Sequence, residues 1–140
     1  SDWDSLSLMT NVKAQMTNDE TQITKKYDLA ERTAKFGEVV IDFVKLLPKS
    51  PINYSLISQV VRSATSVGAN YMEADGAESK KDFFYKISLC KKESKETMHW
   101  FRMISKADLQ NTDTCKKLWQ EAKELSLIFS AIIKNRKSVI

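Results

Sequence analysis

Glycine and proline are scarce in this sequence. The 140 residues include 3 glycines and 2 prolines. Sandwiches of β-sheets and βαβ folds need many tight turns, and tight turns draw on these two residues. The scarcity therefore argues against both folds and favours a few long helices. It also argues against an enzyme built on a glycine-rich phosphate loop. The length suits one domain whose core needs no disulfide or metal.

Residue types that commonly act in catalysis or metal binding are scarce as well. His99 is the single histidine, and neither Cys90 nor Cys115 belongs to a CxxC pair. A catalytic triad would have to use His99, and no nucleophile elbow is present. Glu93 and Glu96 suit salt bridges better than a cation site, and no Glu-x-x-His pair exists. We expect no enzymatic activity, no catalytic residue, no metal and no cofactor, with Cys90 in the core and His99 on the surface.

Membrane and secretion signals are missing too. We find no apolar run of about 18 residues and no signal-peptide pattern at the start of the sequence. Together with two cysteines that form no evident framework, this leads us to expect a cytoplasmic protein without a membrane partner. The net charge of +4 permits an anionic partner without demonstrating one.

The first half of the chain shows helix spacing in two segments. Asp28 is a candidate N-cap, and apolar residues then recur at steps of three and four up to Leu47. The tract 48–51, with a proline at each end, predicts a corner. A second helix is expected over about 53–74. The residues at its centre have small side chains. Gly68 among them costs about 1 kcal/mol of helix stability relative to alanine, which predicts that a neighbouring backbone packs closely there.

The second half predicts two further helices. Ser79, with Asp82 three residues later, resembles a capping box and opens a helix that runs to about 107. Residues 110–113 form the next turn, and the last helix follows with an apolar stripe that starts at Leu118. Short connections favour antiparallel neighbours. We predict an all-α fold, an antiparallel up-down-up-down four-helix bundle over 28–140. Residues 1–27 form an N-terminal arm, either flexible or a short docked helix.

One arc of the third predicted helix carries six basic side chains and no acid, with His99 inside it. Its members are Lys81, Lys91, Lys92, Lys95, Arg102 and Lys106. On the fourth helix the corresponding residues are Lys116, Lys123, Lys134, Arg136 and Lys137. These residues are either solvated surface or a track for phosphates, since Lys and Arg neutralise phosphates and release counterions. No aromatic RNA-binding motif or zinc finger accompanies them.

The opposite flank of the third helix carries a second apolar stripe, interrupted by carboxylates. The stripe consists of Tyr85, Leu89, Trp100 and Met103. A bundle helix needs a single apolar stripe for its core. The second stripe therefore either covers the N-terminal arm or a wider groove, or forms a subunit interface with Trp100 as its strongest anchor.

The stretch 62–74, RSATSVGANYMEA, precedes SKKDF at 79–83 and KESKETMHW at 92–100. These stretches resemble the bacterial four-helix-bundle family of 23S rRNA intervening-sequence proteins, to which the accessory variability determinant of diversity-generating retroelements is related. The resemblance covers about 27–137. Its signature residues are Ser66, Gly68, Ala69, Asn70 and Glu73. Many members have Glu-Gly where this chain has Glu73-Ala74, a difference that should leave the helix intact.

The resemblance implies a homopentamer of four-helix bundles without known catalytic activity. The retroelement relatives bind RNA and a reverse transcriptase through basic surfaces. Two functions remain open at this point. One is an oligomer that binds RNA through the basic faces of the third and fourth helices. The other is a protein–protein scaffold or accessory subunit, for example of a reverse transcriptase, that docks through the N-terminal arm or the apolar surface.

Overall fold

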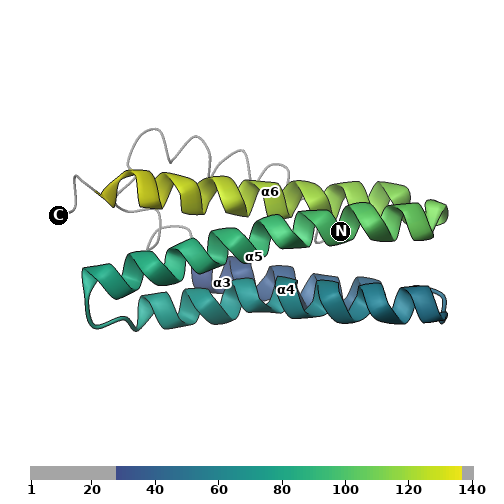
Figure 1. The fold of residues 1–140 in the computed structure, drawn as a ribbon, viewed down its shortest axis with the longest axis horizontal. Helices are drawn as coiled ribbons and strands as arrows, with labels where there is room; N and C mark the ends of the chain where they lie inside the picture. Colours follow the sequence, from purple (N-terminus) through teal and green to yellow (C-terminus); the bar gives the residue numbers. More distant parts are fainter. Residues whose placement is uncertain (1–27, 137–140) are drawn as a thin grey trace.

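The computed structural model describes residues 28–136, which fold as four α-helices and one short 3-10 helix. The elements are α3 (Leu29–Val44), α4 (Pro51–Asp75), α5 (Lys80–Ala107), η2 (Leu109–Asn111) and α6 (Thr112–Lys134). Figure 1 shows consecutive helices running in opposite directions. The predicted all-α bundle is confirmed. The predicted arm 1–27 and Lys137 lie outside the described residues.

Side-chain caps define where three of the helices begin. The Asp28 carboxylate accepts a hydrogen bond from the Glu31 N–H at 3.1 Å, and Ser79 Oγ accepts one from the Asp82 N–H at 3.0 Å. Both caps confirm the sequence prediction. Helix α4 begins at Pro51, two residues earlier than predicted, with Ser50 as its N-cap. Proline fits the first helical position because its missing N–H would have no partner inside the helix.

Two further helix boundaries differ from the prediction. Helix α3 ends at Val44, because the N–H groups of Leu46 and Leu47 bond three residues back and tighten the chain into a turn. Leu47 is still buried there, whereas Leu46 is exposed. The last turn was expected at 110–113, but η2 occupies Leu109–Asn111 and α6 already begins at Thr112.

The core runs along the inside of the bundle. Its largest fully buried side chains include Phe36 of α3, Phe101 of α5 and Phe129 of α6. Cys90 is buried among them, and its Sγ donates a hydrogen bond to the Val67 carbonyl at 3.6 Å. The prediction of Cys90 as a core residue is confirmed.

Gly68 lies where α4 crosses close to α3. A Cβ at this position would be 3.4 Å from the carbonyl carbon, the carbonyl oxygen and the Oγ1 of Thr33. The backbone of α3 thus approaches α4 closely here, as the small centre of the second helix predicts. The close approach leaves room for a methyl group at most, so it favours a residue without a longer side chain at this position.

A buried ion pair connects α3 to α6. The guanidinium of Arg32 donates from Nη2 to Glu121 Oε1 at 2.8 Å and from Nε to Oε2 at 3.0 Å. Each side chain is 5% exposed. Such a two-bond geometry is the strong form of an Arg–carboxylate contact. Because 89 residues separate the partners, the pair fixes two helices that are far apart in the chain.

Candidate nucleic-acid interface

Helix α5 lies between α4 and α6 and presents a different flank to each. Toward α4, Lys86 Nζ pairs with Glu73 Oε1 at 2.7 Å. Toward α6, the Ser105 hydroxyl donates to Thr112 Oγ1 at 3.3 Å. On a helical wheel of about 100° per residue, the predicted basic residues of α5 fall on its α6 side. The predicted second stripe falls on its α4 side.

The basic residues of α5 reach solvent. Lys81, Lys92, Lys95, Arg102 and Lys106 are exposed, and Lys91 is half-buried. His99, within the same arc, is exposed and packs edge-on against Trp100 with 4.9 Å between ring centroids. His99 is thus a surface residue, as predicted from the sequence.

Helix α6 adds a second row of bases on its α5 side. Lys116, Lys123 and Lys134 are exposed and lie on one face of the helix, and Arg136 follows beyond its end. The two helices are antiparallel and meet at the Ser105–Thr112 contact. A similar distance from this contact, toward the start of α5 and toward the end of α6, leads to Lys95 and Lys123, which therefore lie at about the same level of the bundle. The two rows therefore run side by side over the α5–α6 seam. We call this surface, with its α5 and α6 members, the basic face.

No acid neutralises the basic face within residues 28–136. The ion pairs of the described residues do not include any of its lysines or arginines. Glu121 and Glu124 of α6 are both buried and lie on the side of that helix away from α5. Unpaired, exposed cations from two helices on one surface are the charge distribution that attracts a polyanion.

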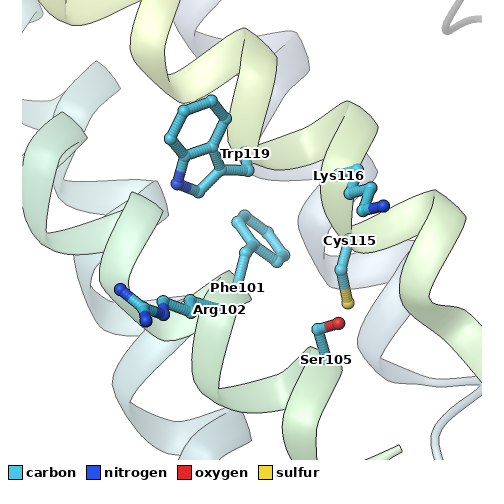
Figure 2. A pocket seen from close by; sticks show the side chains of 6 residues that line it. All are labelled: Phe101, Arg102, Ser105, Cys115, Lys116 and Trp119. Atoms are coloured by element: carbon cyan, nitrogen blue, oxygen red, sulfur yellow. The ribbon is translucent and has the colours of Figure 1, made fainter. Parts of the chain in front are cut away.

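An open groove of about 300 Å³ lies beneath the basic face, between α5 and α6. Figure 2 shows the six side chains that line it: Phe101, Arg102 and Ser105 from α5, and Cys115, Lys116 and Trp119 from α6. Phe101 and Trp119 form the middle of the groove, and Arg102 and Lys116 extend on opposite sides of it. An apolar, aromatic recess is therefore bordered by two cations.

Sequence reasoning did not single out Trp119 as part of a site. Trp119 is half-buried, and Lys123 Nζ lies 5.4 Å from the centroid of its ring. Its position on the helical wheel of α6, between the apolar stripe and the row of lysines, is the sequence feature that could have indicated a role at this surface. An aromatic residue at such a boundary has one edge in the core and one face toward solvent.

Burial controls the chemistry of both cysteines. It raises the pKa of the Cys115 thiol to about 11, with a smaller contribution from Asp108, and that of the Cys90 thiol to about 12. Because the thiolate is the nucleophile, neither thiol is suited to covalent catalysis at neutral pH. Cys115 contributes shape to the groove rather than reactivity.

The apolar flank of α5 consists of Tyr85, Leu89, Trp100 and Met103. Tyr85 is 57% exposed, while Leu89 and Met103 are half-buried. Trp100 packs partly against the core, and its indole N–H donates to Glu96 Oε2 at 2.9 Å. Tyr85 is therefore the member that reaches furthest into solvent.

Carboxylates hold the apolar flank to α4. Glu96 also pairs with Arg62 of α4, and Glu93 contacts the same guanidinium at 3.3 Å. Glu93 and Glu96 thus form the salt bridges that their spacing suggested. Within residues 28–136, no group of three or more His, Cys, Asp or Glu side chains is arranged to hold a metal ion.

The signature residues organise α4 and its contacts. Ser66 Oγ donates to the Arg62 carbonyl at 2.6 Å, and Asn70 Nδ2 donates to the Ser66 carbonyl at 2.9 Å. Glu73 accepts from Lys86 of α5, and this hydrogen bond raises the pKa of Lys86. Gly68 and Ala69 line a second groove of about 280 Å³, between α3 and α4. These residues lie away from the basic face.

None of the described helices is long and apolar enough to cross a bilayer.

Comparison with known proteins gives a clear result for the family. No curated protein matches the chain. A crystal structure of a protein of unknown function from the S23 ribosomal protein family of Bacteroides thetaiotaomicron is similar, with a TM-score of 0.69 and 26% identity over 75% of this chain and 97% of that one. The model of the 23S rRNA-intervening sequence protein family matches residues 25–131. The chain belongs to the family of 23S rRNA-intervening sequence proteins.

Proposed function

We propose that this protein is a non-enzymatic oligomer that binds RNA through the basic face of α5 and α6. The observation that carries the proposal is the convergence of two rows of exposed, unpaired cations over one seam. Each helix alone would be an ordinary solvated surface. Side by side, the rows offer an acid-free strip on which successive phosphates can each meet a cation.

Binding of this kind depends steeply on salt. Each neutralised phosphate releases condensed counterions, so the affinity falls with a slope of about 0.7–0.9 per contact on a double-logarithmic plot. The described part of the basic face is made of long, flexible cationic side chains. We therefore expect affinity for RNA as a polyanion, with little preference for one base sequence.

Charge reversal on the basic face tests the proposal. The triple variant Lys92→Glu, Lys95→Glu and Arg102→Glu changes three exposed residues of α5. Fluorescence anisotropy with a labelled RNA should show at least a tenfold loss of affinity at about 100 mM salt, and a smaller salt slope.

The matched control reverses the same number of charges elsewhere. Lys45→Glu, Lys49→Glu and Lys117→Glu change exposed lysines off the basic face and alter the net charge equally. RNA affinity should decrease much less in this control. Equal losses in both triple variants would mean that net charge alone governs binding, and unchanged affinity in the first would remove the proposed interface.

A second candidate function is protein docking through the apolar flank, as in a scaffold or an accessory subunit of an enzyme such as a reverse transcriptase. The exposure of Tyr85 beside the half-buried Leu89, with Met103 further along the same side of α5, favours it. A partner held by this flank should remain bound at high salt during co-purification. It should be lost on Tyr85→Lys, whereas Tyr54→Lys, at an equally exposed tyrosine of α4, should retain it. Retention by both variants would contradict docking at the flank.

A further inference from the structure

We infer that the groove between α5 and α6 is a pocket for one unpaired base, so that single-stranded RNA is the preferred ligand of the basic face. This inference rests on the proposed RNA binding and makes it more specific. The groove measures about 300 Å³, the lower end of the range for small-molecule pockets. A single planar ring system fits such a space, and a stack of several bases does not.

The lining matches the chemistry of a nucleotide. Trp119, which is half-buried, offers aromatic surface to the groove, whereas Phe101 borders the groove from the core and is fully buried. The remaining lining is mainly apolar apart from its rim. Arg102 and Lys116 extend on opposite sides, where the phosphates on either side of an inserted base would lie. Ser105 adds a hydroxyl to the lining.

Trp119 is positioned to stack. One side of its ring attracts a cation, since Lys123 Nζ lies 5.4 Å from the centroid. Trp119 is half-buried, so part of its ring reaches solvent. Stacking on aromatic side chains, combined with a positively charged track for the backbone, is how proteins hold single strands without sequence preference.

Duplex RNA cannot use this pocket. Its bases are stacked and paired inside the helix, and only phosphates, riboses and base edges reach a protein. A duplex would still contact the lysines of the basic face. The pocket should therefore separate single-stranded from double-stranded RNA, whereas the basic face alone should not.

An uncharged apolar compound is a weaker match for the groove. Such a ligand would fill the aromatic middle but leave Arg102 and Lys116 without a role at the rim. Among residues 28–136, no carboxylate lines the groove to pair with either cation. An anion that carries an aromatic ring uses both parts of the lining.

The test compares two RNA probes of equal phosphate number, one an unstructured single strand and the other a hairpin stem. Binding to the full chain is measured by anisotropy for the wild type and for Trp119→Leu, which keeps an apolar side chain but removes the ring. Loss of one stacked base should weaken single-strand binding roughly 5- to 150-fold. Hairpin binding should change less than twofold. Trp119→Phe should restore most of the single-strand affinity, and circular dichroism should confirm that both variants are folded.

Three outcomes would overturn the inference. Equal binding of both probes by the wild type would mean that no base enters the pocket. Unchanged single-strand affinity in Trp119→Leu would mean the same. An equal loss for both probes, not restored by Trp119→Phe, would assign Trp119 a role in the fold alone. Failure of the wild type to bind either probe is a separate result, because it would remove the proposed function itself.

A second measurement locates the contact directly. A single strand that carries 4-thiouridine, irradiated on the wild-type protein, should give cross-linked peptides from the segment that contains Cys115 and Trp119. Cross-links confined to lysine-bearing segments without this stretch would place the bases outside the groove and contradict the inference.

Discussion

At the scale of single residues, the contact between Gly68 and Thr33 shows how one absent side chain sets a helix spacing. A Cβ at position 68 would meet three atoms of Thr33 at 3.4 Å, two of them in the backbone. That distance is at the lower edge of ordinary van der Waals contact. A methyl group is therefore accommodated, whereas any longer side chain must move α3 away from α4.

Substitutions at Gly68 should reveal this limit. Gly68→Ala gains about 1 kcal/mol of helix propensity against a tight contact, so we expect its free energy of unfolding within about 1 kcal/mol of the wild type. Gly68→Leu should lose about 1–3 kcal/mol through overpacking. Ala69→Leu, at the exposed neighbouring position, is the control and should stay near the wild type. Urea denaturation measures all three, and a stable Gly68→Leu variant would contradict the close approach.

At the scale of helices and turns, most of the fold could be predicted from local features of the sequence. The caps at Asp28 and Ser79 were recognisable because a cap needs only a short polar side chain and the N–H groups that follow it. The ends of α3 and of the 110–113 turn were misplaced by a few residues. A 3-10 turn continues helix-like spacing past the last α-helical residue, so periodicity alone does not show where the helix ends.

The N-cap of α5 gives a prediction for one element. Ser79→Ala removes the acceptor of the Asp82 N–H and should lower the free energy of unfolding by about 1 kcal/mol. Ser79→Asp should keep the cap and lose little. Ser55→Ala, at an exposed serine within α4, serves as the control in the same denaturation series. A loss at Ser55 as large as that at Ser79 would mean that the hydroxyl of Ser79 contributes no cap.

The groove and the α3–α6 contact were not predictable from the sequence. Arg32 and Glu121 are charged residues that a sequence reader assigns to the surface, yet each side chain is 5% exposed. Their burial depends on which helices become neighbours, and no local pattern encodes that. Likewise, Arg102 and Lys116 were each predicted on a basic face, but only the packing of α5 on α6 places the two around Phe101 and Trp119.

At the scale of the whole molecule, α5 separates two surfaces of different chemistry. The basic face lies toward α6, and the apolar flank with Tyr85 lies toward α4. A polyanion and a protein partner could occupy them at the same time without competing. Assembly through the apolar flank should resist salt, because burial of apolar surface is not screened by ions, whereas RNA binding should weaken with salt.

Self-assembly can be tested at Tyr85. If the apolar flank is the interface of the proposed oligomer, Tyr85→Lys should lower the mass measured by light scattering to that of one chain, with the helical content unchanged. Tyr54→Lys is matched in residue type and exposure, since both tyrosines are 57% exposed. It should leave the assembly intact. A parent protein that has the mass of one chain at micromolar concentration would contradict an interface on this flank.

The cysteine beneath the groove has a consequence for the lifetime of the protein under oxidative conditions. Peroxides and disulfides react with the thiolate, and a thiol with a pKa of about 11 offers very little of it near neutrality. Cys115 is also 2% exposed, and Cys90 is fully enclosed. Neither thiol is available to cross-link copies of the chain or to acquire polar oxygens that would reshape the groove. Among the methionines and cysteines of α4, α5 and α6, Met72 is the most exposed residue, at 58%, and is the one an oxidant reaches first.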